Sequence, residues 1–246
     1  MFSLLKKELR GFFSSIIGYV VILVFITINS AIVWGLPFPG FPSWLLDNGY
    51  AELTPLFIWS PLVFLILVPA VTMRSFAEEK NTGTIELLFT RPISSLQIVL
   101  AKFFSGLILV LFSLLPTLVY FISVYQLGDP VGSIDVGATW GSYIGLFFLG
   151  AVYVAIGIFA SSLTKSQIVA FLLSLILAAL FFYGFDALGQ ITSLASLDYI
   201  LVNLGIQEHY LSISRGVIDT RDVIYFISVV TVFVFLTHIV LESRKW

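Results

Sequence analysis

Charged side chains are rare in this sequence, and one group of them lies between two long apolar stretches, at residues 74–96. After Arg74, with a leucine from the apolar run between them, the candidate residues are Glu78, Glu79, Lys80, Glu86, Leu88 and Arg91. A short apolar helix in such a segment is typical of an element on which another protein docks, and the charged residues are candidate contacts. Each charge is equally well explained as a solvated group at the end of a helix.

A second charged group precedes the last apolar stretch and consists of Arg215, Asp219, Arg221 and Asp222. Opposite charges this close in sequence are expected to pair locally and to organise the loop that carries them. Direct contact with a substrate is the alternative interpretation.

The residue sets that catalysis requires are missing. The sequence has no G-x-x-x-x-G-K-S/T phosphate-binding loop and no H-E-x-x-H motif, its two histidines are isolated, and it has no cysteine. We therefore expect no catalytic site, cofactor or metal in this chain. Any ATP-driven role requires a partner that binds ATP and Mg²⁺.

Six charge-free stretches must position these groups: 11–46, 53–73, 103–128, 136–164, 166–185 and 223–241. Each meets or exceeds the roughly 20 residues that a helix needs to cross a bilayer. No Pro/Ser linker or low-complexity run separates them. The sequence predicts an all-α polytopic membrane protein with six transmembrane helices in one domain, residues 1–246.

The distribution of lysine and arginine predicts the orientation, because short cytoplasmic loops are enriched in both. With both termini in the cytosol, ten of the twelve basic residues lie inside and nine of the fourteen acidic residues lie outside. The stretch 74–96 then lies in the cytosol, and a long loop between the fifth and sixth helices lies outside. A bacterial cytoplasmic (inner) membrane is the expected location.

Local patterns predict further helices outside the membrane. In residues 1–12, Lys6, Lys7 and Arg10 lie opposite an apolar face, which indicates an interfacial helix or simply a positively charged anchor. In 74–96, residues 81–83 (NTG) predict a helix stop, a short apolar helix follows, and Ser94 with Gln97 forms a capping-box pattern. Leucines and isoleucine between 191 and 204 repeat at helical spacing in the outer loop.

Residues 74–103 resemble the segment that joins the second and third helices of ABC-2-type permeases: an acidic pair, Gly-Thr, Glu-Leu-Leu, a proline, and a lysine entering the next helix. Residues 209–226 are similar to the stretch that leads into the last helix of that family, and the turn at 161–167 has the same spacing. Within the family, the chain looks most like the gliding-motility-associated permease subunit.

The resemblance implies a half-transporter. Two six-helix subunits, a second copy or a related permease, would pair on two cytosolic ABC ATPase subunits, which would grip the amino-terminal helix and the coupling-type helix of 74–92. The gliding-motility group implies an auxiliary membrane protein with a large extracytoplasmic domain. No nucleic-acid partner is expected.

The resulting hypothesis is a permease subunit of an ATP-driven exporter or mechanochemical complex. Two alternatives stay open. An ion-coupled secondary transporter is disfavoured because no carboxylate lies within the six charge-free stretches, although backbone carbonyls can hold Na⁺. A membrane scaffold that transports nothing is the other.

Overall fold

The structure is a computed structural model of the whole chain, and it describes all residues except 36–44, 46–48, 91–92, 190–202 and 244–246. The described residues form helices and no strands. The bounds of the helices in the first half of the chain are α1 (Phe2–Ser14), α2 (Ile16–Trp34), α4 (Thr54–Thr72), α5 (Arg74–Asn81), α6 (Ile85–Phe89), α7 (Ser95–Leu114), the 3₁₀ turn η1 (Leu115–Thr117) and α8 (Leu118–Leu127). Those of the second half are α9 (Val136–Leu163), α10 (Gln167–Ala179), the π-helical turn η2 (Leu180–Gly184), α11 (Phe185–Gly189), α13 (Ile206–Ser214) and α14 (Thr220–Glu242).

Among the described residues, five helices are long and apolar enough to cross a membrane: Thr54–Asn81, Ser95–Leu127, Val136–Leu163, Gln167–Gly189 and Thr220–Glu242. A sixth span results if α1 and α2, which meet at 63°, count as one bent helix. The predicted helical membrane protein is confirmed, with five to six spans. The leucine repeat expected in the outer loop lies almost entirely outside the described residues.

Local sequence signals fix several helix ends. Gly83 takes a positive φ of 73° directly after α5, at the predicted stop. Ser94 caps α7: its Oγ accepts a hydrogen bond from the backbone N–H of Gln97 (3.3 Å), and the Gln97 side chain accepts one from the Ser94 N–H (3.4 Å). The predicted capping box is therefore confirmed. Pro116 replaces one turn of α-helix by η1 between α7 and α8, as expected where a proline removes a backbone donor.

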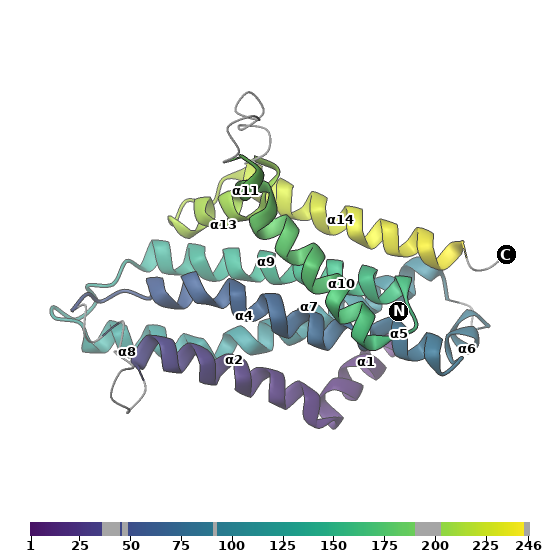
Figure 1. Cartoon of the computed structure of the whole chain (residues 1–246). Coiled ribbons are helices and arrows are strands. Elements are labelled where there is room, and N and C mark those ends of the chain that lie inside the picture. The colour runs from purple at the N-terminus through teal and green to yellow at the C-terminus, as the bar shows by residue number, and fades with distance from the viewer. Residues whose placement is uncertain (36–44, 46–48, 91–92, 190–202, 244–246) are drawn as a thin grey trace.

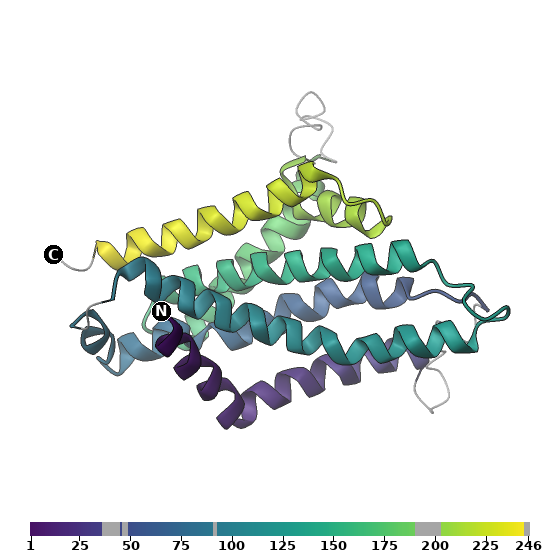
Figure 2. The same ribbon diagram turned by 180° about the vertical axis from the view of Figure 1, so that it is seen from behind.

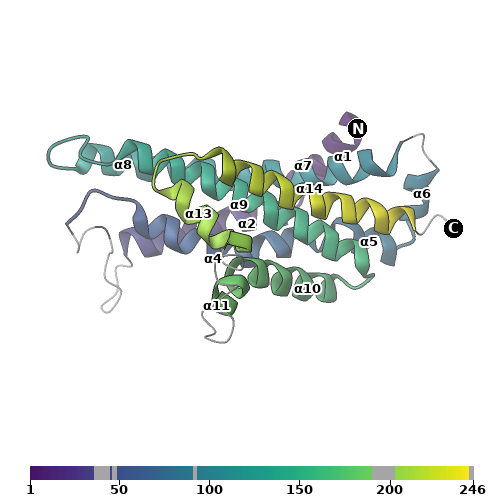
Figure 3. The ribbon, with the colours of Figure 1, turned by 90° about the horizontal axis from the view of Figure 1, so that it is seen from above.

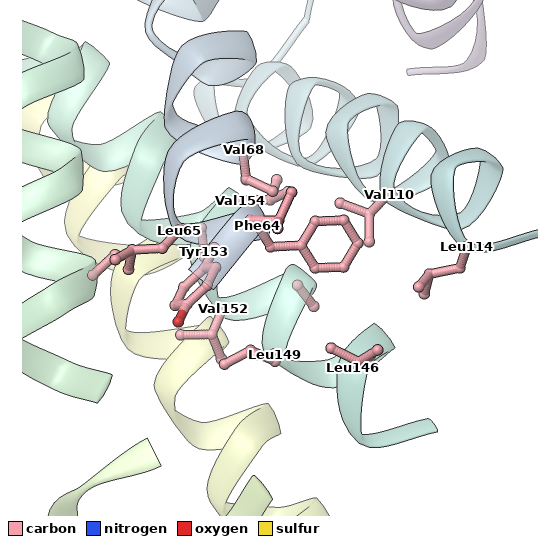
Figure 4. Packing of buried hydrophobic residues seen from close by; sticks show 14 of the residues in the cluster. Phe64, Leu65, Val68, Val110, Leu114, Leu146, Leu149, Val152, Tyr153 and Val154 are labelled. Atoms are coloured by element: carbon pink, nitrogen blue, oxygen red, sulfur yellow. The ribbon is translucent and has the colours of Figure 1, made fainter. Parts of the chain in front are cut away.

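Helix α9 lies at the centre of the bundle and packs against α4, α7, α10, α13 and α14. Figures 1 and 2 show α9 between α14 and α4, and Figure 3 shows α10 running alongside it. Figure 4 shows Val154 of α9 beside Phe64 of α4 and Val110 of α7, while Leu149, Val152 and Tyr153 of α9 lie on another side of the helix within the same core.

Glycines let the neighbouring helices approach α9 closely. A Cβ at Gly157 would lie 1.9 Å from the Thr72 Oγ1, and one at Gly141 would lie 2.6 Å from the Ile213 carbonyl oxygen. The small residues of α9 therefore serve packing within this chain at these two positions, as small-xxx-small patterns do between membrane helices.

Candidate functional site

The predicted docking segment forms a bent pair of short helices, α5 and α6, which we call the elbow (Arg74–Phe89). In Figures 1 and 2 the elbow lies at the same end of the bundle as α1 and the last turn of α14. Contacts between α5 and both α9 and α10 attach its first half to the bundle. The elbow is thus a projection from one end of a packed core.

A buried ion cluster connects the elbow to two other helices. The Nζ of Lys102 on α7 lies 3.0 Å from the Oε1 of Glu79 on α5 and 3.3 Å from the Oε1 of Glu8 on α1. The Lys102 side chain is 2% exposed, and its ammonium also lies 5.0 Å from the centre of the Phe76 ring. Removing such a charge from water is costly, so its stability depends on the two carboxylates and the aromatic face.

A second set of hydrogen bonds ties the elbow to the end of α9. The buried Oγ of Ser161 accepts from the backbone N–H groups of Phe76 (2.9 Å) and Ala77 (3.0 Å), and donates to the carbonyl of Met73 (2.8 Å). The Lys80 ammonium donates to the Ser162 carbonyl oxygen. These bonds therefore attach the first half of the elbow to the end of α9.

The elbow residues predicted to contact a partner fall into two groups. Glu79 and Lys80 point into the contacts just described, and both side chains are largely buried. Glu78 and Glu86 are exposed, as is Leu87, at 66%. Leu88 lies in α6, but its side chain, like the whole of Arg91, falls outside the described residues.

The predicted cationic face of α1 is exposed at Lys6, Lys7 and Arg10. The other side of α1 is attached to the bundle by the buried Leu4 and by Glu8, which pairs with Lys102 of α7. The end of α14 joins the same region, since the Ser95 Oγ donates to the Glu242 Oε1 at 3.3 Å. Three helices far apart in sequence therefore meet the start of α7.

At the opposite end of the bundle, the predicted outer-loop residues divide similarly. Asp219 caps α14 by accepting from the Arg221 N–H (3.0 Å), and the buried Asp222 pairs with His209 (Nδ1···Oδ1 2.7 Å). Arg215 and Arg221 are exposed, and no ion pair involves them within the described part of the chain. Local organisation of this loop thus rests on a cap and a histidine.

Three residues form contacts that the sequence analysis did not predict. Lys102 reads as an ordinary cytosolic charge, Ser161 as one of many serines, and His209 as an isolated histidine. His209 in fact stacks on Tyr225 with ring centres 3.8 Å apart, and its other nitrogen lies 2.9 Å from the Asn203 carbonyl oxygen. Each becomes visible only when separate helices are brought together.

Five to six long apolar helices, with α9 at their centre, define a multi-pass membrane protein. The sequence matches the family described as ABC-2 family transporter protein over residues 46–241, so the chain belongs to that family and is a transmembrane permease. No curated protein matches the sequence significantly. Family members are membrane components that are generally not catalytic themselves, and membership implies an ABC ATPase partner.

Proposed function

We propose that this chain couples ATP hydrolysis by a separate cytosolic ABC ATPase to rearrangement of its membrane helices, with the ATPase docking on the elbow and α1. The observation that carries the proposal is the Glu8–Lys102–Glu79 cluster, because it joins both docking elements to α7. The exposed charges on each element would meet the ATPase, and the buried charges would hold the elements to the bundle.

The contacts suggest how force would travel. A push on α6 reaches α5, which is bonded to α9 through Ser161 and to α7 through Lys102. Packed helices switch between discrete arrangements rather than deforming continuously. The proposed response is therefore a change in packing of α4 and α7 against the more buried α9.

The proposed assembly contains two ATPase subunits, which bind ATP and Mg²⁺, and a second permease, identical or related. The same proposal places the termini and elbow in the cytosol of a bacterium and the protein in its inner membrane. Export or mechanical work on another membrane protein would be the output. Gliding motility, with an auxiliary protein bearing a large extracytoplasmic domain, is the finer proposal; its support is the resemblance of residues 74–103 and 209–226.

The direct test is copurification of the chain with the ABC ATPase encoded beside it, with ATP hydrolysis measured on the complex. Glu78→Lys with Glu86→Lys reverses two exposed charges of the elbow and should reduce the retained ATPase by about tenfold. The new lysines would face the ATPase cations that the glutamates are proposed to meet, and like charges that face each other at an interface are strongly unfavourable. Glu208→Lys, an exposed acid on α13, is the matched control and should retain the ATPase fully.

The amino-terminal helix is tested separately by converting Lys6, Lys7 and Arg10 to glutamine. The expected result is weaker retention with an unchanged membrane-inserted fraction. If both sets of variants keep the ATPase and its stimulated hydrolysis at the wild-type level, the proposed docking surface is wrong. If no ATPase associates in detergent or lipid, an ion-coupled carrier or a scaffold becomes the better description.

A further inference from the structure

A pocket of about 540 Å³ opens at the end of the bundle opposite the elbow. It lies between the first turns of α4 and α9, the π-helical turn η2, and α13. Figure 1 shows the first turns of α4 and α9 at the end away from α5 and α6. This volume falls within the range of pockets that hold small organic ligands, about 300–1,000 Å³.

The wall of the pocket is aromatic, and its charges are negative. Five aromatic side chains contribute: Phe57, Trp59, Phe182, Tyr183 and Tyr210. Glu52 and Asp135 are the acidic residues, and none of the described lining residues is a lysine, arginine or histidine. Aromatic faces and carboxylates both attract a cation, whereas an anion would find no opposite charge here.

Three hydroxyl groups of the pocket offer acceptors, because their hydrogens are already donated to other groups. Thr54 donates to Glu52 (3.0 Å), Ser142 to the Ala138 carbonyl (2.8 Å), and Tyr210 to the Phe57 carbonyl (2.6 Å). Burial and the absence of water around it raise the pKa of the Tyr210 phenol, so it stays protonated and keeps that donation. These three hydroxyl groups therefore present lone pairs to a ligand.

One buried acceptor in the pocket lacks a partner. The Oε1 of Gln207 is inaccessible to solvent and makes no hydrogen bond within the described part of the chain. A buried carbonyl oxygen without a donor is destabilising, so a donor supplied by a ligand would be favourable. An ammonium group supplies N–H donors and positive charge together.

We propose that this pocket binds a primary organic ammonium ion carried on a small apolar body. The ammonium would be held by Glu52, Asp135 and Gln207, and the apolar part would lie against the aromatic wall. A soluble lipophilic amine and the ethanolamine headgroup of a lipid share this chemistry. The inference requires neither ATPase docking nor transport.

The probe is tritiated 4-phenylbutylamine, which is protonated at pH 7 because alkylamines have pKa values near 10, as lysine does. Its binding is measured on the full chain in phosphatidylcholine nanodiscs, with empty nanodiscs subtracted. 4-Phenylbutanol as competitor has the same apolar body without the charge, and should bind about tenfold more weakly.

Glu52→Gln with Asp135→Asn removes both charges but keeps the side-chain acceptors used by Thr54 and by the N–H of Ala138. It should weaken amine binding about five- to tenfold, because two exposed carboxylates contribute modestly. Asp219→Asn, which removes a capping carboxylate outside the pocket, is the matched control and should bind normally. Trp59→Leu, at a side chain 39% exposed, gives a second variant expected to fold and to bind more weakly.

Saturable binding that prefers the amine and falls in the carboxamide and Trp59 variants supports the proposal. Equal affinity for amine and alcohol, unchanged binding in both variants, or no saturable binding overturns it. Repeating the titration with phosphatidylethanolamine in the nanodisc distinguishes the sources: competition identifies the lipid headgroup, and its absence identifies a soluble amine.

Discussion

Replacing Lys102 by methionine removes the cation that Glu8 and Glu79 share, while keeping a side chain of similar length. At an effective dielectric constant of about 20, each ion pair, at 3.0 and 3.3 Å, corresponds to about 5 kcal/mol of attraction. Desolvation of the three groups offsets most of that energy in the native protein. After the substitution, however, two carboxylates that are only 15% and 16% exposed remain without compensation.

We therefore expect Lys102→Met to lower the free energy of unfolding by about 3–5 kcal/mol, the usual cost of breaking a buried ion pair. The assay is unfolding of the purified chain in mixed micelles by increasing dodecyl sulfate, followed by tryptophan fluorescence. Lys165→Met, at an exposed lysine in the turn after α9, should change stability by less than about 0.5 kcal/mol.

A triple variant separates the cost of the uncompensated carboxylates from the cost of the changed side chain at position 102. Glu8→Gln and Glu79→Gln added to Lys102→Met leave no uncompensated charge, and should recover most of the lost stability because neutral replacements of buried ion sets are often well tolerated. The reasoning is refuted if Lys102→Met costs less than about 1 kcal/mol, or if the triple variant is less stable than Lys102→Met alone.

Two further substitutions test the packing around α9. Gly157→Ala places a methyl group 1.9 Å from the Thr72 Oγ1, and should cost about 1–3 kcal/mol in the same unfolding assay as the helices move apart. Ser161→Ala deprives the N–H groups of Phe76 and Ala77 of their acceptor, and should cost about 1–3 kcal/mol and speed amide hydrogen exchange at the start of α5.

Matched controls for these two variants lie on the same kinds of helix. Gly137→Ala introduces only an ordinary contact, 3.4 Å from the Asp135 Oδ1, and should leave stability within about 0.5 kcal/mol of wild type. Ser228→Ala removes an exposed hydroxyl bonded to its own helix and should behave similarly. Equal effects of each variant and its control would contradict the assigned contacts.

The features that the sequence predicted correctly depend on neighbouring residues. A charge-free stretch long enough to span a bilayer is a helix because its backbone polar groups have no other partners in lipid. Ser94 and Gln97 cap α7 through bonds that join residues three apart, and Gly83 ends α5 by a backbone conformation that suits glycine. Such signals need no knowledge of the tertiary structure.

The burial of individual charges depends on distant residues and was not predictable. Lys80 and Glu79 follow Glu78 directly, yet the rotation of α5 turns the first two inward and leaves the third exposed. Lys102 and Glu79 form an ion pair although they lie 23 residues apart in the sequence, and no periodic pattern predicts that pair. The exposed charges at the elbow are accordingly fewer than the sequence indicated.

The pairing of Glu8 with Lys102 also constrains how the protein is made. Glu8 leaves the ribosome 94 residues before its partner, which at 5–20 residues per second is an interval of about 5–20 s. In the proposed orientation the Glu8 carboxylate stays hydrated at the cytosolic surface until α7 has been inserted. The amino-terminal helix can therefore settle against the bundle only after the third span is in place, so the first element synthesised is among the later ones to dock.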